Sequence, residues 1–198
     1  MGDQEAGRGD ADKRRRVLDS ATHAFLNYGF ERTTMDDIAR AAEMSRPALY
    51  LLFRNKADIY RAIAEGLFEE MLDRSAAALA GEGALRDRLA AMLEEGMFGM
   101  MSGIEGTPHG AEMMDMKSLI ADLVDGWQRR LRALVSAELD AEAKRRGVDL
   151  ATAGHSADSL AMLFWDAFEG MKARGVGVAG KRSAAPGLIA LVAGAVGA

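Results

Sequence analysis

Apolar residues recur at helical spacing along most of the chain. The first helical segment begins near Lys13 and ends at Tyr28, where Gly29 follows in the position at which a left-handed glycine commonly ends a helix. Before it, residues 1–12 are polar and rich in glycine, which predicts a disordered arm. The apolar face of this helix is formed by Val17, Ala21, Ala24, Phe25 and Tyr28.

Two short helices with clear start signals follow, within residues 34–53. Thr34 precedes Asp37 by three positions, a variant of the capping box that marks a helix N-terminus. Ser45 is a good N-cap for the second helix, and Pro47 falls in its first turn, where a missing N–H costs little. Two short helices joined by a tight turn are typical of the helix-turn-helix motif, whose second helix enters the DNA major groove.

The remaining chain also has the helical period, and no segment alternates in the manner of a strand. The sequence therefore predicts an all-α protein of about nine helices: a three-helix helix-turn-helix DNA-binding head followed by a helical body. We place the head at residues 1–56 and the body at residues 57–198. Expected helices of the body cover residues 55–79, 85–97, 113–146 and 156–174, and a short apolar helix follows Pro186.

Charge divides the chain in the same way. Residues 13–56 hold nine Lys and Arg against five Asp and Glu, whereas residues 61–198 hold 15 against 20. The whole chain of 198 residues has a net charge of −5, which excludes a globally basic protein that coats nucleic acid but leaves room for a local basic surface. A basic head on an acidic body suggests two separate tasks.

Composition also limits the chemistry. Without cysteine the chain has no disulfide, thiolate metal site or cysteine nucleophile, and its three histidines form no recognisable catalytic triad. We therefore predict no enzyme activity, no cofactor and no metal site, although His109, Glu112 and Asp115 have a spacing that a metal ion could use. The longest apolar run has 11 residues, fewer than the roughly 20 that span a bilayer. No signal peptide is visible, and the expected location is the cytoplasm.

Residues 13–60 resemble the DNA-binding domain of the tetracycline-repressor (TetR) family of transcriptional regulators. The remaining chain matches that family only in length and helical pattern, and the resemblance implies that it is a helical ligand-binding and dimerisation body. One departure is Glu43, which stands where a turn glycine is common; a left-handed glutamate there costs about 1 kcal/mol. The matching positions are Gly29, Phe30, Thr34, Ile38, Ala39, Ala42, Ser45, Leu49, Tyr50, Phe53 and Lys56.

The resemblance implies specific DNA contacts. Arg46 would reach base edges, since Arg to guanine is the commonest specific contact, and Pro47 and Ala48 would touch thymine methyl groups. Tyr50, Thr34 and Lys56 would bind backbone phosphates. Lys13–Arg16 are either further phosphate contacts or a solvated helix start. The predicted DNA-binding residues are Thr34, Ser45, Arg46, Pro47, Ala48, Tyr50 and Lys56.

The body is rich in methionine, a side chain that adapts to irregular cavities. Thirteen methionines are present, and many crowd the middle of the chain near aromatic residues. They either pack the core or line the effector site that the family resemblance implies, with His109, Glu112 and Asp166 as candidate polar anchors. The predicted pocket residues are Met92, Met97, Phe98, Met101, His109, Met113, Trp127, Phe164, Trp165 and Phe168.

The resulting functional prediction is a homodimeric repressor that a small apolar effector releases from a palindromic double-stranded DNA operator. The last two helices are the expected dimer interface, as the resemblance implies. The alternative is a helix-turn-helix regulator without an effector, whose body only dimerises. No membrane association is expected.

Overall fold

The computed structural model describes residues 2–198 and divides the chain into two compact units. One unit consists of residues up to Leu67 together with Ile104–Leu123, and the other of Phe68–Gly103 and Val124–Ala198. Within the described residues there are ten α-helices and no strands, which confirms the all-α prediction. The α-helices are α1 (Gly2–Tyr28), α2 (Met35–Ala41), α3 (Arg46–Leu52), α4 (Lys56–Leu79), α5 (Leu85–Leu93), α6 (Gly99–Glu105), α7 (Gly110–Asp115), α8 (Ala121–Arg146), α9 (Ala157–Ala173) and α10 (Val178–Ala195).

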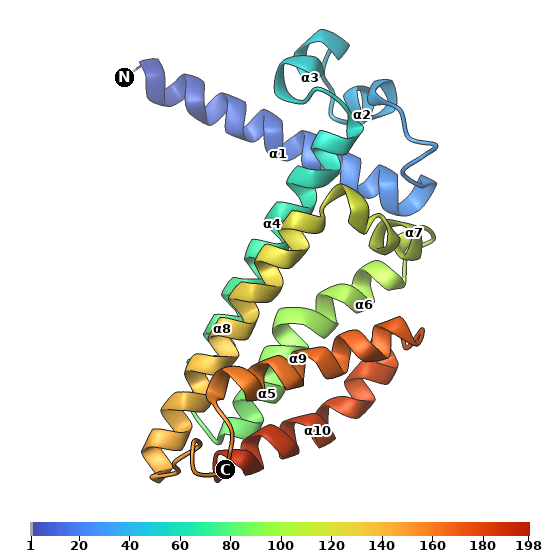
Figure 1. The fold of residues 1–198 in the computed structure, drawn as a ribbon. Helices are drawn as coiled ribbons and strands as arrows, with labels where there is room; N and C mark the ends of the chain where they lie inside the picture. Colours follow the sequence, from blue (N-terminus) through green and yellow to red (C-terminus); the bar gives the residue numbers. More distant parts are fainter. Residues whose placement is uncertain (1) are drawn as a thin grey trace. The chain divides into compact units, whose positions relative to one another are not determined.

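The first unit is built on a small apolar core shared by α1, α2, α3 and the start of α4 (Figure 1). Val17 and Phe25 of α1 are fully buried, as are Ile38 of α2, Leu49 of α3 and Ile59 of α4. Each lies on the apolar face that the helical spacing predicts. Four helices therefore share one core, which fixes α3 relative to α1 and α2.

A later part of the chain completes this unit. His109 N donates a hydrogen bond to Leu26 O at the end of α1 (3.0 Å), and the hydroxyl of Tyr60 donates to Met113 O (2.8 Å). Arg61 of α4 forms an ion pair with Asp122 at the start of α8. The compact unit therefore differs from the expected head of residues 1–56, because these contacts connect residues 104–123 to it.

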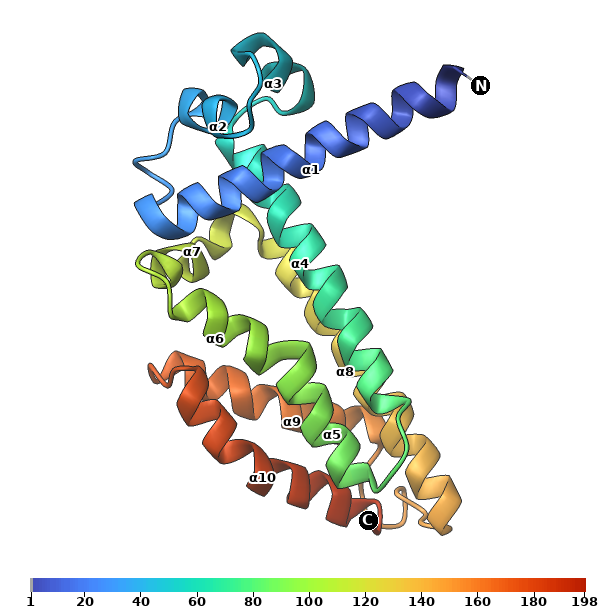
Figure 2. The same cartoon turned by 180° about the vertical axis from the view of Figure 1, so that it is seen from behind.

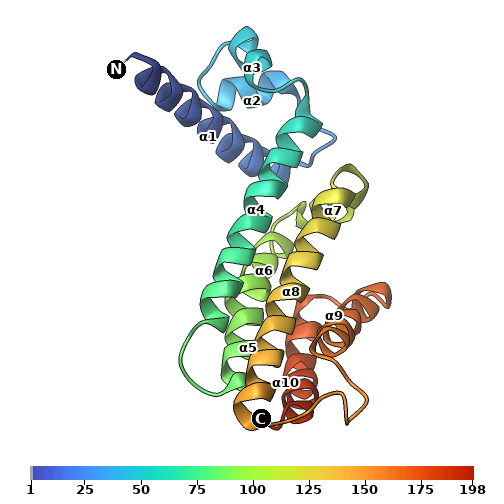
Figure 3. The same ribbon diagram turned by 60° about the vertical axis from the view of Figure 1, so that its left-hand side comes forward.

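The second unit is a bundle of α5, α6, α9, α10 and the adjoining parts of α4 and α8. The α4 and α8 segments lie side by side (Figure 3), and Arg130 of α8 forms an ion pair with Glu69 of α4. Next to α10 lie α9 and α5 (Figure 2). Between α5 and α6 the chain forms one π-helical turn, Glu94–Phe98, where Gly96 lies directly against Ser75 of α4.

Three helix boundaries differ from the prediction. First, α1 begins at Gly2 rather than near Lys13, and ion pairs one turn apart, such as Asp10–Lys13 (3.1 Å), support its early turns. Of the arm predicted to be disordered, only Met1 lies outside the described residues.

Second, the expected helix 113–146 is interrupted by a short 3₁₀ turn, Lys117–Leu119, between α7 and α8. Third, Pro186 lies inside α10, whose buried positions Ala185, Ile189 and Val192 continue across it. Packing of this apolar face outweighs the hydrogen bond that proline removes. No helix among residues 2–198 is long and apolar enough to cross a membrane.

Candidate functional site

The starts of α2 and α3 are each fixed by local hydrogen bonds. Thr34 and Asp37 form the predicted capping box: Asp37 N donates to the Thr34 hydroxyl oxygen (3.2 Å), and Thr34 N donates to the Asp37 carboxylate (3.0 Å). The Thr34 hydroxyl also donates to the Asp37 carboxylate (2.6 Å), and this bond, with the one from Thr34 N, lowers the pKa of Asp37 below its usual value. Ser45 caps α3 by accepting from Ala48 N (3.3 Å). Glu43, between the two helices, has a φ of 54°, the left-handed conformation expected from the sequence.

The outer face of α3 carries most of the predicted base-reading side chains. Leu49 points into the core, while Arg46, Pro47 and Tyr50 are exposed and Ala48 is half-buried. The guanidinium of Arg46 lies 5.6 Å from the centre of the Tyr50 ring and forms an ion pair with Asp36 Oδ2 (3.1 Å). Because both side chains are exposed, the Arg46–Asp36 ion pair is weak, and Arg46 can leave Asp36 for a stronger partner.

Leu51 is an exposed residue of α3 that the sequence prediction omitted. Its side chain is 88% exposed, next to Tyr50 and on the face opposite Leu49. A leucine at this position contributes nothing to the core, so it is a candidate for apolar contact with a thymine methyl group. The signal was present in the sequence, because the helical spacing that buries Leu49 and Phe53 turns Leu51 outward.

Lys56 takes part in a contact that the sequence did not suggest. Its ammonium donates to Phe30 O (2.8 Å) and Glu31 O (3.2 Å) and lies 4.4 Å from the centre of the Phe30 ring. Two of its three N–H groups thus hold the turn between α1 and α2. The ammonium also pairs with the Glu31 carboxylate (3.8 Å), so a phosphate would compete with that ion pair for the third N–H. Thr34 is similarly occupied, since its hydroxyl donates to Asp37 (2.6 Å).

The basic segment Lys13–Arg16 lies on α1. Lys13 pairs with Asp10, Arg15 pairs with Asp12, and the Arg14 guanidinium stacks on Phe53 at 4.3 Å from the ring centre. The stacking of Arg14 on the last residue of the helix-turn-helix connects this segment to the predicted DNA-binding face.

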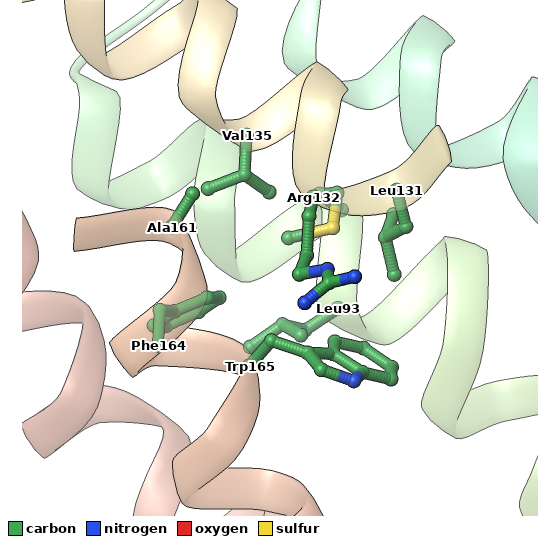
Figure 4. A pocket seen from close by; sticks show the side chains of 8 residues that line it. Leu93, Leu131, Arg132, Val135, Ala161, Phe164 and Trp165 are labelled. Carbon is green, nitrogen blue, oxygen red and sulfur yellow. The ribbon is translucent and has the colours of Figure 1, made fainter. Parts of the chain in front are cut away.

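A small apolar pocket lies in the second unit, between α5, α8 and α9 (Figure 4). Three predicted pocket residues, Met92, Phe164 and Trp165, are among those that line it. Its free volume is about 10 Å³, room for about one water molecule. The other lining residues are Leu93, Leu131, Arg132, Val135 and Ala161.

Most of the other predicted pocket residues pack the core around it. Phe98 and Phe168 are buried with their ring centres 5.9 Å apart, and Met97, which precedes Phe98 in the sequence, is also buried. Trp127 stacks on Phe68 and meets Trp165 edge to face at 5.2 Å. Met101 on α6 is half-buried, and Asp166 is exposed.

His109 and Met113 do not line this pocket, contrary to the prediction. Both belong to the first unit, where the backbone of each is hydrogen-bonded as described above. His109 Nδ1 lies 2.9 Å from Glu112 Oε2, which lowers the pKa of Glu112, and both side chains pack against Gly29. Gly29 has a φ of +89°, and this tight turn leaves the space that His109 fills. Asp115 does not join them: no three metal-ligating side chains gather in the described chain.

Arg132 is the polar residue among the five lining residues that the sequence analysis missed. It is half-buried on α8, and no hydrogen bond or ion pair joins it to another described residue. The indole N–H groups of Trp127 and Trp165 are also buried without an acceptor in the described chain. A buried donor without a partner costs about 1–3 kcal/mol, so such groups are uncommon in a core that has only a structural task.

Comparison with known proteins places these features in a family. Residues 17–63 match the family model described as "Bacterial regulatory proteins, tetR family". The Transcriptional regulator AcuR of Cereibacter sphaeroides is 34% identical over 157 residues, which cover 72% of this chain and 66% of AcuR. This chain spans from 34% to 66% of the length of the first three curated relatives it matches.

Solved structures share the fold over nearly the whole chain. FadR of Bacillus subtilis in complex with stearoyl-CoA has a TM-score of 0.60 and 13% identity, with 90% of this chain and 96% of FadR covered. The SmeT–triclosan complex has a TM-score of 0.61 and 16% identity, with 91% and 90% covered. At these identities the likeness concerns the fold alone. Together with the family match and the 34% identical relative, the helix-turn-helix described above shows that this chain belongs to the TetR family of bacterial regulatory proteins.

Proposed function

We propose that the protein is a homodimeric repressor that binds a palindromic DNA operator and leaves it when a small apolar effector enters the second unit. The observation that carries the DNA-binding part is the outer face of α3, where Arg46, Tyr50 and Leu51 are exposed on a helix whose start and inner face are fixed. Such a face fits the major groove, and Arg46 is its candidate for reading guanine.

The DNA-binding proposal is tested by selecting operators from a random duplex pool and measuring affinity for the best site and its point variants. Arg46→Ala should cost about 1–3 kcal/mol at one base pair of each half-site and relax the preference there. Arg40→Ala is the matched control, since Arg40 is also exposed, lies on α2 and pairs with Asp37. Equal weakening of all sequences by Arg46→Ala would contradict a base-reading role.

Dimerisation is proposed through the outer faces of α9 and α10. Leu160, Phe164 and Phe168 of α9 are already buried within the chain. The apolar side chains that remain outside are Met162 and Leu163 of α9 and Leu191 of α10, the last 72% exposed. Leu163→Glu should weaken the dimer in sedimentation experiments. The fold should stay intact, because the Leu163 side chain is exposed and does not belong to the core of the chain.

The effector part rests on the small pocket and on what is bound by two proteins of the same fold, one with stearoyl-CoA and one with triclosan. For release to occur, the effector must bind the DNA-free protein more tightly than the DNA-bound protein. Effector and operator DNA should therefore lower each other's affinity for the protein by the same factor. A ligand that binds tightly and leaves operator affinity unchanged would contradict this coupling.

One observation favours the alternative of a regulator without an effector. A free volume of about 10 Å³ is far below the roughly 300–1,000 Å³ of ordinary ligand sites, so a ligand must open the pocket by moving side chains. A thermal-shift screen of small molecules separates the two proposals. A compound that raises the unfolding temperature and releases DNA favours the effector, and a body that no compound stabilises favours a dimerisation role alone.

A further inference from the structure

Two acidic residues, Asp36 and Asp37, follow Thr34 at the start of α2, and they have different tasks. Asp37 closes the capping box, because its carboxylate accepts from Thr34 N and from the Thr34 hydroxyl. The Asp36 side chain is not part of that cap and is 51% exposed. Its Oδ2 lies 3.1 Å from the guanidinium of Arg46, ten positions further along the chain. The ion pair therefore joins the first turn of α2 to the first residue of the adjacent helix α3 (Figure 1).

The Asp36 carboxylate lies on the surface that is proposed to meet DNA. The fold gains little from it there, since an exposed ion pair contributes little to stability. Next to DNA, a carboxylate repels the phosphates and lowers the affinity for every sequence. This cost is offset on a sequence that offers the carboxylate a hydrogen-bond donor, so Asp36 favours such a sequence over all others.

The major-groove edge of one kind of base pair matches the two side chains together. Guanine presents the acceptors N7 and O6, and the cytosine opposite it presents an N4–H donor. A guanidinium has donors alone and an ionised carboxylate has acceptors alone. When Arg46 leaves Asp36 for guanine, the carboxylate stays within one hydrogen-bond length of the place that the guanidinium occupied. The donor nearest to that place in the same base pair is the cytosine amino group.

We infer that Asp36 is a specificity-determining residue, which reads one G·C base pair together with Arg46: Arg46 binds the guanine and Asp36 accepts from the N4 amino group of the cytosine. This inference rests on the proposed base-reading role of Arg46. Each charged side chain exchanges its partner in the protein for one on the same base pair, so neither is left unpaired. With thymine in place of cytosine the carboxylate meets the O4 acceptor, and binding is penalised.

A base analogue separates the two contacts, because guanine and cytosine cannot be exchanged independently in a duplex. An operator is selected from a random duplex pool, and the base pair that Arg46 reads is the one at which Arg46→Ala relaxes the preference. Its cytosine is then replaced by N4-methylcytosine, which keeps Watson–Crick pairing and puts a methyl group in place of the amino hydrogen that points into the major groove. The wild-type protein should lose about tenfold in affinity, the effect of one hydrogen bond to a charged group. The same analogue at a cytosine outside the half-sites is the control duplex.

Variants assign this loss to one side chain. Asp36→Ala should bind the methylated and unmethylated operators with equal affinity. It should also bind random duplex DNA about threefold more tightly at low salt, because one negative charge is removed from the DNA-binding surface. A side chain that only supported the fold would lower both affinities, so the two opposite changes identify a role in specificity. Asp19→Ala is the control variant, since Asp19 is an exposed acid on α1 of the same unit, and it should stay as sensitive to the methyl group as the wild type.

The inference is overturned if the methyl group costs the wild-type protein less than about twofold, if Asp36→Ala stays as sensitive to it as the wild type, or if Arg46 reads a base other than guanine. In each of these cases the protein still binds its operator. A pool that yields no operator instead contradicts the proposed function, and the inference with it, so the two failures are distinguishable.

Discussion

Replacing Lys56 by methionine should destabilise the head as well as weaken DNA binding. The ammonium makes two charge-assisted hydrogen bonds, 2.8 Å to Phe30 O and 3.2 Å to Glu31 O, and stacks on the Phe30 ring. Hydrogen bonds to charged groups contribute about 1.5–3 kcal/mol each when buried. The Lys56 side chain is 26% exposed and the Glu31 bond is the longer one, which lowers the expected total to about 2 kcal/mol.

The assay is thermal unfolding followed by circular dichroism. A loss of about 2 kcal/mol corresponds to a fall of about 4–8 °C in Tm for a chain of this size. Lys144→Met is the control: Lys144 is an exposed lysine paired with Asp140 one turn away, and its loss should cost no more than about 0.5 kcal/mol. An unchanged Tm for Lys56→Met would refute the structural role derived from the two carbonyl contacts.

The salt dependence of DNA binding tests the second role of Lys56 separately. If its third N–H reaches a phosphate, as the sequence predicts, the variant should lower the slope of log affinity against log salt concentration by about one. A lower affinity with an unchanged slope would show that Lys56 acts only by positioning the turn between α1 and α2.

Three further substitutions test local features. Glu43→Gly should raise stability by about 0.5–1 kcal/mol in urea unfolding, because glycine relieves the left-handed strain at φ 54°; a loss would contradict that strain. The ion pair with α4 holds the pKa of Asp122 at about 2, below its ordinary 3.8. The stability difference between wild type and Asp122→Asn should therefore be constant above about pH 4 and vanish as the pH falls toward 2, and a difference that persists at low pH would exclude the pair as its source. Gly96→Ala should cost about 1–3 kcal/mol, since its Cβ would lie 2.1 Å from Ser75 Oγ, whereas Gly103→Ala has open space and should be neutral or stabilising; equal effects would contradict the close approach.

Features set by local hydrogen bonding were predictable from the sequence. The caps at Thr34 and Ser45 and the left-handed Glu43 each depend on residues within a few positions of one another, so their spacing is visible in the sequence. The all-α fold followed from the helical period for the same reason.

Features set by contacts between distant residues were not predictable. Lys56 meets carbonyls 25 and 26 positions away, and Arg132 meets residues of α5 and α9 that no periodic pattern connects to it. His109 and Met113 were assigned to the pocket because of their residue types, although the tertiary structure uses them elsewhere. The helical period identifies which face of a helix is buried but not which partner buries it.

The participation of residues 104–123 in the first unit has a consequence for protein engineering. Chimeric regulators are built by joining the DNA-binding part of one protein to the sensing part of another, with a single junction after the helix-turn-helix. In this protein such a junction at residue 56 would separate Leu26 and Gly29 from His109, and both would then meet whatever loop the donor body supplies. A chimera that also carries residues 104–123 keeps these contacts, so the transplantable DNA-binding module of this chain consists of two separate stretches of sequence.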